Sequence, residues 1–332
     1  MRDKSNKIFT KKINMFKPWF SGIIVFAVIL SVTGCSGKAE EARNKNFQNG
    51  IKAVESSNYA GAIKNFDKAL NNADMKVGDE EEDICCYKAA AQYLNGDAKG
   101  AVDTVSGLIK LRKGDADYYF LRGSYYASES KFDDADKDYK KVIELTPKDY
   151  DIYFTIYENL TARGQNDMAA SYLKSVLASK DNGPKCHIAK GRVYIIKSDY
   201  AKAKVEFKYA VDRGNNEGYL WLAKCCNTKG ESNAALEYID KYSQKEKRSS
   251  ESYNAIAEAE MALKNYNDAE KNIEKALKEK DVTNKQDVLR NQIICLENLG
   301  KFDKAKSYAS DYIKSYPTDR GMLDEWQFLS TR

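Results

Sequence analysis

Histidine is nearly absent from this sequence of 332 residues, and the common catalytic signatures are missing as well. The one histidine is His187, beside Cys186. Adjacent side chains on a helix point about 100° apart, so these two do not meet as a catalytic pair. No GxxxxGK(S/T), GxGxxG, HExxH or GxSxG element occurs. We therefore predict a protein that is not an enzyme and that uses no cofactor.

Proline is also scarce, and its positions favour helices. The four prolines are Pro18, Pro147, Pro184 and Pro317. None falls inside an expected helix, where proline would remove a hydrogen bond and clash with the preceding turn. The sequence therefore predicts many uninterrupted helices joined by turns.

Net charge is close to zero once the N-terminal segment is set aside. The chain has 54 basic and 49 acidic residues. Residues 1–35 hold six basic residues and one acidic residue, which leaves 48 of each sign. A nucleic-acid-binding fold would show a basic stripe on its folded part. We expect no nucleic acid among the partners.

The sequence instead contains an internal repeat of about 34 residues. Its clearest copy is residues 116–149, where two short helical patterns are separated by a turn and followed by Pro147. A lone helix hairpin of this kind cannot bury both of its apolar seams, so copies must stack. The copies align on eight alanines: Ala62, Ala101, Ala135, Ala169, Ala203, Ala235, Ala269 and Ala305.

This pattern resembles the tetratricopeptide repeat (TPR) over roughly residues 44–317. Gly123, Ala135, Tyr139 and Pro147 stand at the positions typical of that family, whereas Arg122 departs from its leucine. The resemblance implies an all-α, right-handed superhelical solenoid of about eight helix–turn–helix repeats. Residues 318–332 are expected to form a C-terminal capping helix. The resemblance is specific for fold and much less so for function.

The first 35 residues have the order of a bacterial lipoprotein signal. A basic start precedes an apolar run, residues 19–32, that is shorter than the roughly 20 residues of a spanning helix. The run ends in Val32-Thr33-Gly34-Cys35, which resembles a lipobox. This implies removal of residues 1–34, diacylation of Cys35 and attachment to the extracytoplasmic face of the cell membrane. Residues 35–43 would then be the lipidated cysteine and a polar tether. The alternative is an uncleaved anchor with an incidental cysteine.

The adjacent cysteine pairs do not predict a metal site. Cys85-Cys86 and Cys225-Cys226 lie four repeats apart, and each repeat of a solenoid touches only its neighbours. Metal ligands must converge within a few ångströms, so we expect no metal. The acidic run 79–83 has two interpretations, a site for cations or basic partners and a solvated run at a helix N-terminus, where negative charge is favourable. The second is preferred.

The concave face is the remaining candidate for function. In TPR proteins the first helix of each repeat lines a groove, and carrying its fifth, ninth and twelfth slots over gives an apolar ladder bordered by charges. An extended peptide or a helix would suit this surface. The alternative is that the fifth slot only packs against its neighbours. The predicted partner-groove residues are Phe120, Phe154, Glu158, Ile188, Arg192, Leu220, Lys224 and Asn227.

These observations favour a membrane-anchored, non-catalytic scaffold that binds protein or peptide partners at the bacterial cell envelope. A second interpretation is an outer-membrane or pilus assembly lipoprotein. A third is a surface component that binds glycans or nutrients, in which some of the 23 tyrosines would stack on sugars. A cluster of exposed rings on one concave patch would favour the third interpretation.

Overall fold

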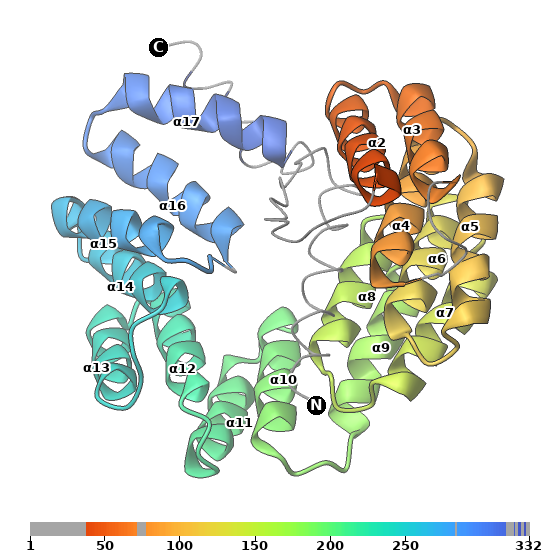
Figure 1. The fold of residues 1–332 in the computed structure, drawn as a ribbon. Helices are drawn as coiled ribbons and strands as arrows, with labels where there is room; N and C mark the ends of the chain where they lie inside the picture. Colours follow the sequence, from red (N-terminus) through yellow and green to blue (C-terminus); the bar gives the residue numbers. More distant parts are fainter. Residues whose placement is uncertain are drawn as a thin grey trace. The chain divides into compact units, whose positions relative to one another are not determined.

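The computed structural model describes residues 38–71, 78–282 and 284–316, together with residues 322, 325, 326 and 329. Within these residues the chain forms sixteen α-helices and no strand, so the all-α prediction is confirmed (Figure 1). The helices are α2 (Lys38–Glu55), α3 (Tyr59–Asn71), α4 (Asp79–Leu94), α5 (Ala98–Leu111), α6 (Ala116–Ser128), α7 (Phe132–Leu145), α8 (Asp151–Thr161), α9 (Asn166–Ala178), α10 (Pro184–Ile196), α11 (Tyr200–Asp212), α12 (Glu217–Thr228), α13 (Ser232–Ser243), α14 (Ser250–Ala262), α15 (Tyr266–Lys278), α16 (Lys285–Asn298) and α17 (Phe302–Ser315).

The helices form eight consecutive pairs, as the repeat predicts, and the chain divides into two compact units between Tyr172 and Leu173. The first unit contains α2 to α8 and the start of α9, and the second contains the end of α9 and α10 to α17. In the second unit the first helices α10, α12, α14 and α16 each contact the next one in this series. The right-handed superhelix stays a prediction.

A left-handed residue joins the two helices of every pair. Each such residue lies five positions before the aligned alanine of its repeat, and φ ranges from 57° to 86°. Glycine provides four of these turns, and this conformation costs it little. The other four use serine or lysine, which rarely adopt it. The eight residues are Ser57, Gly96, Ser130, Gly164, Ser198, Gly230, Lys264 and Gly300.

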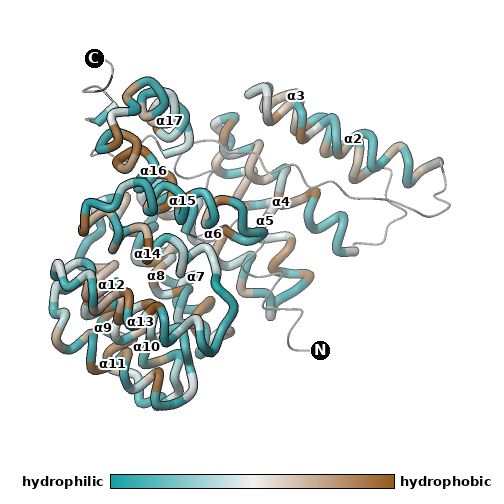
Figure 2. The backbone as a smooth tube through the Cα atoms, turned by 90° about the vertical axis from the view of Figure 1, so that its left-hand side faces the viewer, coloured by the Kyte–Doolittle hydropathy of each residue, from teal (hydrophilic) through white to brown (hydrophobic). Residues whose placement is uncertain are grey.

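The repeat positions form the core of each unit. All eight aligned alanines are fully buried. Glycine fills the close contact between paired helices where a ring occupies the other side. A Cβ at Gly191 would lie 2.3 Å from Cε1 of Phe207, and a Cβ at Gly50 would lie 2.3 Å from Cε1 of Phe66. The rings therefore explain the small residue that the sequence pattern requires. Figure 2 shows hydrophobic and hydrophilic residues alternating along the helices, as expected when one face of each helix is buried.

Helical structure at the two ends of the repeat array can be compared with the boundaries predicted from the sequence. Helix α2 begins at Lys38, so residues 38–43 of the predicted tether are helical and belong to the first repeat. Near the C-terminus, Met322 and Leu329 are helical and buried, and they pack with Tyr312 in one apolar cluster. The predicted signal segment and Cys35 lie outside the described residues.

The acidic run at the start of α4 is structural rather than simply solvated. Glu81 and Glu82 are buried. Arg43 donates to Glu81 at 2.7 Å and also pairs with Glu80, while Arg112 pairs with Glu82. The run therefore ties α2, α4 and α5 together. Its position at a helix N-terminus agrees with the preferred interpretation, but Glu81 and Glu82 are buried and ion-paired rather than solvated.

Among the helices that the structure describes, none is both long enough and apolar enough to cross a bilayer.

Candidate protein-binding face

The predicted apolar ladder is buried rather than exposed. Phe120, Phe154 and Ile188 are 7%, 4% and 5% exposed, and Leu220 is half-buried. Phe120 packs 5.7 Å from the ring of Tyr139, measured between centroids. These residues therefore fill the space between neighbouring helices, and the prediction of an exposed apolar strip was wrong. An aspartate at position 154 or 188 would bury a carboxylate and unfold the repeat, so it would not report on binding.

The predicted polar residues fall into two groups. Glu158 is exposed on α8 of the first unit. Arg192, Lys224 and Asn227 lie on α10 and α12 of the second unit, which are in contact. The structure adds four residues that the sequence did not indicate. We call this set of residues the polar face, although Asn254 within it is buried; it comprises Arg192, Trp221, Lys224, Asn227, Asn254, Glu258 and Asn291.

An aromatic ring with two cations near it forms one part of the polar face. Trp221 is half-buried and stacks on the fully buried Phe207, with ring centroids 5.6 Å apart. Cζ of Arg192 lies 5.5 Å from the indole centroid, and Nζ of Lys224 lies 5.6 Å from it. Both distances fall in the range of cation–π attraction. Phe207 thus fixes the ring that positions the two charges.

A cluster of three asparagines and a glutamate forms the other end, across α12, α14 and α16. Asn254 Nδ2 donates to Glu258 Oε1 at 3.0 Å. Asn291 Nδ2 donates to Asn254 Oδ1 at 3.0 Å and to Glu258 Oε1 at 3.3 Å. Asn227 Nδ2 donates to the carbonyl oxygen of Ala255 at 3.1 Å. We call these four side chains, Asn227, Asn254, Glu258 and Asn291, the amide cluster. It links three first helices by polar contacts.

The carboxyl group of Glu258 is perturbed by this environment. Burial raises its pKa above the ordinary value. The positive charge of Lys224 and the hydrogen bonds from Asn291 and Asn227 oppose this shift, and the charge of Asp287 adds to it. The pKa remains raised, so the folded protein holds this proton at a pH where an exposed glutamate has lost it.

This shift predicts a pH dependence of stability. Unfolded Glu258 titrates near the ordinary pKa of 4.5, and the folded carboxyl titrates above it. Between these values the folded state binds more protons, so the free energy of unfolding should fall as the pH rises. Glu258→Gln should remove this fall, while Glu260→Gln on the same helix should retain it. Urea unfolding between about pH 4 and pH 8 measures the slopes; equal slopes in both variants would contradict the assignment.

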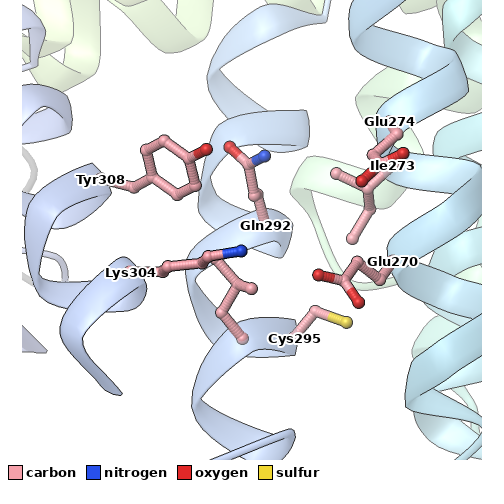
Figure 3. Close-up of a pocket in the computed structure, with 8 residues that line it drawn as sticks. Glu270, Ile273, Glu274, Gln292, Cys295, Lys304 and Tyr308 are labelled. Carbon is pink, nitrogen blue, oxygen red and sulfur yellow. The ribbon is translucent and has the colours of Figure 1, made fainter. Parts of the chain in front are cut away.

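A small pocket lies elsewhere in the second unit, between α15, α16 and α17. Its cavity volume is about 60 Å³, enough for a few water molecules. Figure 3 shows Glu270 and Glu274 of α15 on one side and Lys304 and Tyr308 of α17 on the other. Lys301 Nζ donates to both oxygens of Glu270, at 2.6 and 2.7 Å. The pocket is too small for a peptide side chain with its backbone.

His187 has a structural environment. Its Nδ1 lies 2.6 Å from Glu206 Oε2, and its Nε2 lies 2.9 Å from Asn182 Oδ1. The imidazole is 7% exposed and packs beside Tyr209. Both ring nitrogens therefore face oxygens that anchor α10 to α11 and to the preceding loop. Cys186 is fully buried.

Burial makes at least two of the thiols poor nucleophiles and poor metal ligands. Burial raises the pKa of Cys225 and of Cys295 to about 11, so both stay protonated at neutral pH. The six cysteines in the described ranges are free, and five of them are buried. Within those ranges no three potential metal-ligating side chains gather.

Tyrosines do not form a stacking platform on the polar face. Tyr118, Tyr125, Tyr139 and Tyr312 are among the largest fully buried side chains. Tyr209 and Tyr308, which are 46% and 43% exposed, belong to the second helices α11 and α17. The placement of these rings gives the glycan interpretation no support.

Comparison with known proteins identifies the repeat. Residues 116–149, which form α6, α7 and their following turn, match the family model described as Tetratricopeptide repeat. The chain contains a tetratricopeptide (TPR) repeat within an array of TPR-like helix pairs. The other seven helix pairs share the register of that unit, with a buried alanine five residues after each left-handed turn. Residues 192–322 also match the model described as Coatomer epsilon subunit.

The chain is similar to proteins of several organisms. It is 29% identical over 104 residues to DnaJ homolog subfamily C member 3 of Gallus gallus, which is 31% of this chain and 19% of that protein. The chain thus spans about a fifth of that curated relative. A solved tetratricopeptide repeat protein from Parabacteroides merdae is 11% identical, with a TM-score of 0.46, over 77% of this chain and 99% of that one. Cut9-Hcn1 of the APC/C hetero-tetramer is 12% identical, with the same TM-score, over 88% and 57%.

Proposed function

We propose that this TPR chain is a non-catalytic scaffold whose polar face binds an extended segment of a protein partner. The amide cluster carries the proposal. It joins amide groups and one carboxyl group of three consecutive first helices by hydrogen bonds, and Lys224 of the same face lies over the half-buried indole of Trp221. Polar side chains that can pair with a peptide, next to an aromatic anchor, are features of protein recognition sites.

We propose further that lipid on Cys35 holds the scaffold at the outer face of the bacterial cell membrane. The support is the order of the N-terminal segment, with a basic start, an apolar run and a lipobox-like end. Two acyl chains bind a membrane firmly, whereas one is marginal. Residues 36 and 37 alone separate Cys35 from α2, so the repeats would work close to the membrane surface.

Site-specific photo-crosslinking in intact cells tests the binding face. A photoreactive phenylalanine derivative would replace Lys224, which is exposed on α12 within the polar face. The matched control replaces Lys208, which is exposed on the second helix α11. We expect a discrete crosslinked protein from position 224 that is absent from position 208. The same products from both positions, or products from position 208 alone, would contradict the proposed face.

A further inference from the structure

An exposed run of residues in the first unit lies at the end of the repeats where the proposed lipid is attached. Residues 110–114, Lys-Leu-Arg-Lys-Gly, finish α5 and begin the connection to α6, and all five are exposed. We call them the basic turn. We infer that the basic turn contacts the membrane that holds Cys35, with Leu111 between the lipid headgroups and the acyl chains. This inference rests on the proposed lipid attachment, because it gives the anchored protein a second contact with the same membrane.

Leu111 is the apolar element of this contact. It is 60% exposed, the highest value among the large hydrophobic side chains that the structure describes. The repeat does not impose this exposure, because Leu145, ten residues after the aligned alanine of the next repeat, is half-buried. A leucine side chain that stays in water loses the favourable free energy of burial. An apolar partner at this position would therefore be favourable.

Contacts on both sides hold the basic turn in place. Arg112 pairs with Asp79 at 2.6 Å and also with Glu82, and both carboxylates belong to the first turn of α4. The hydroxyl group of Tyr119 on α6 donates to the carbonyl oxygen of Lys113 at 3.2 Å. The backbone is thus fixed while its tip stays in solvent. An ordered turn loses less conformational entropy on binding than a mobile one does.

The start of α2 lies against the same turn of α4. Arg43 pairs with Glu80 and Glu81, which also belong to the first turn of α4. Further along the two helices, the rings of Phe47 and Tyr87 lie 5.4 Å apart between centroids. Helices α2 and α4 therefore run in the same direction and begin at the same end of the first unit. The basic turn is ion-paired with that turn of α4, so it lies at this end too.

The proposed lipid would keep this end of the first unit close to the membrane. Arg43 is the sixth residue of α2, so the helix extends about 7–8 Å beyond it to Lys38. The three residue steps from Lys38 back to Cys35 span at most about 11 Å. A group tethered this closely meets the bilayer at a high effective concentration, so a weak contact is sufficient.

The charges at this end suit a phospholipid surface. Exposed cations, Lys110 and Lys113, stand before and after Leu111 in the sequence. The four carboxylates at positions 79–82 are neutralised in part by their ion pairs with Arg43 and Arg112. Lysines near a membrane are attracted to anionic lipids, and interfacial segments combine such cations with apolar side chains. The partner of the basic turn is thus an anionic phospholipid surface.

The test places a single tryptophan at one end of α5 or the other, in the full lipidated chain that also carries Trp19→Phe, Trp221→Phe and Trp326→Phe. Leu111→Trp reports on the basic turn. Lys99→Trp is the matched control, because residue 99 is exposed near the opposite end of the same helix, about 18 Å away. Each variant is reconstituted into vesicles of phosphatidylcholine and phosphatidylglycerol. Brominated phosphatidylcholine then replaces the ordinary lipid, because bromine in the acyl region quenches tryptophan emission.

We expect the brominated lipid to lower the emission from position 111 at least about twofold, since interfacial groups lie about 5–10 Å deep. The emission from position 99 should not change. Vesicles without phosphatidylglycerol should give weaker quenching at position 111. Quenching at both positions or at neither would overturn the inference. Equal quenching with and without phosphatidylglycerol would overturn the assignment to anionic lipid.

Flotation of the same vesicles separates this inference from the proposal on which it rests. If the protein does not float with the vesicles, the lipid attachment is wrong and the inference falls with it. If the protein floats and position 111 is not quenched, the attachment stands and the contact of the basic turn is wrong. A blue shift without quenching at position 111, growing with the amount of protein per vesicle, would assign the turn to a second copy of the chain and would also overturn the inference.

Discussion

Replacing Phe207 with alanine should lower the free energy of unfolding by about 3–5 kcal/mol. The ring is fully buried on α11, fits against the bare backbone of Gly191 and supports the indole of Trp221. Its removal leaves a cavity at the contact between paired helices, which the small Gly191 cannot fill. Urea unfolding followed by Trp221 emission measures the loss, in a chain that lacks the other two tryptophans.

The matched control for this cavity is Phe302→Ala. Phe302 begins α17 and is 38% exposed, so its truncation should cost less than about 1 kcal/mol. Similar losses in both variants would contradict the assigned packing of the fifth repeat. A cost well below 2 kcal/mol for Phe207→Ala would do the same, since buried phenylalanines usually cost more.

Replacing Cys35 with alanine should release the protein from membranes and abolish its labelling by an alkyne-bearing fatty acid. The proposed attachment is lipid on Cys35, as the lipobox-like sequence that ends in this cysteine implies. Each acyl methylene contributes about 0.8 kcal/mol to membrane binding, so the loss of two chains should move nearly all of the protein to the soluble fraction. Fractionation and in-gel detection of the label report the two effects.

Cys85→Ala is the control for lipid attachment. Cys85 is a half-buried thiol on α4, and its loss should change neither labelling nor fractionation. If the unmodified sequence takes up no label and Cys35→Ala stays with the membrane, the alternative of an uncleaved apolar anchor is correct. If the label disappears only in Cys85→Ala, the acyl chain is attached to Cys85 and the assignment to Cys35 is wrong.

The register of the repeats could be predicted because it depends on local sterics. Ala135 and its seven equivalents are fully buried where paired helices touch, and only a small residue fits there. Half of the turns could not be predicted, because Ser57, Ser130, Ser198 and Lys264 adopt a left-handed conformation that their side chains disfavour. Packing of the two helices fixes that conformation, and the local sequence does not reveal it.

The candidate site was predicted only in part. Arg192, Lys224 and Asn227 were assigned to the groove from their slots, and they lie in the polar face. The burial of Phe154 and Ile188 could not be read from slots, because it depends on how closely neighbouring first helices pack. A signal for the amide cluster was present, however. Asn254 occupies the fifth slot, which holds a large apolar residue in the four preceding repeats.

The central claim is that a protein partner binds the polar face of the second unit. Its most direct test is the affinity of the purified partner, once crosslinking from position 224 has identified it, for full-length chains carrying Lys224→Glu or Lys208→Glu. Both lysines are exposed, so neither change should disturb folding. We predict that Lys224→Glu weakens binding about tenfold or more, because it replaces the cation beside the Trp221 indole with a carboxylate, and that Lys208→Glu leaves binding unchanged. Equal affinities for the two variants would contradict the account.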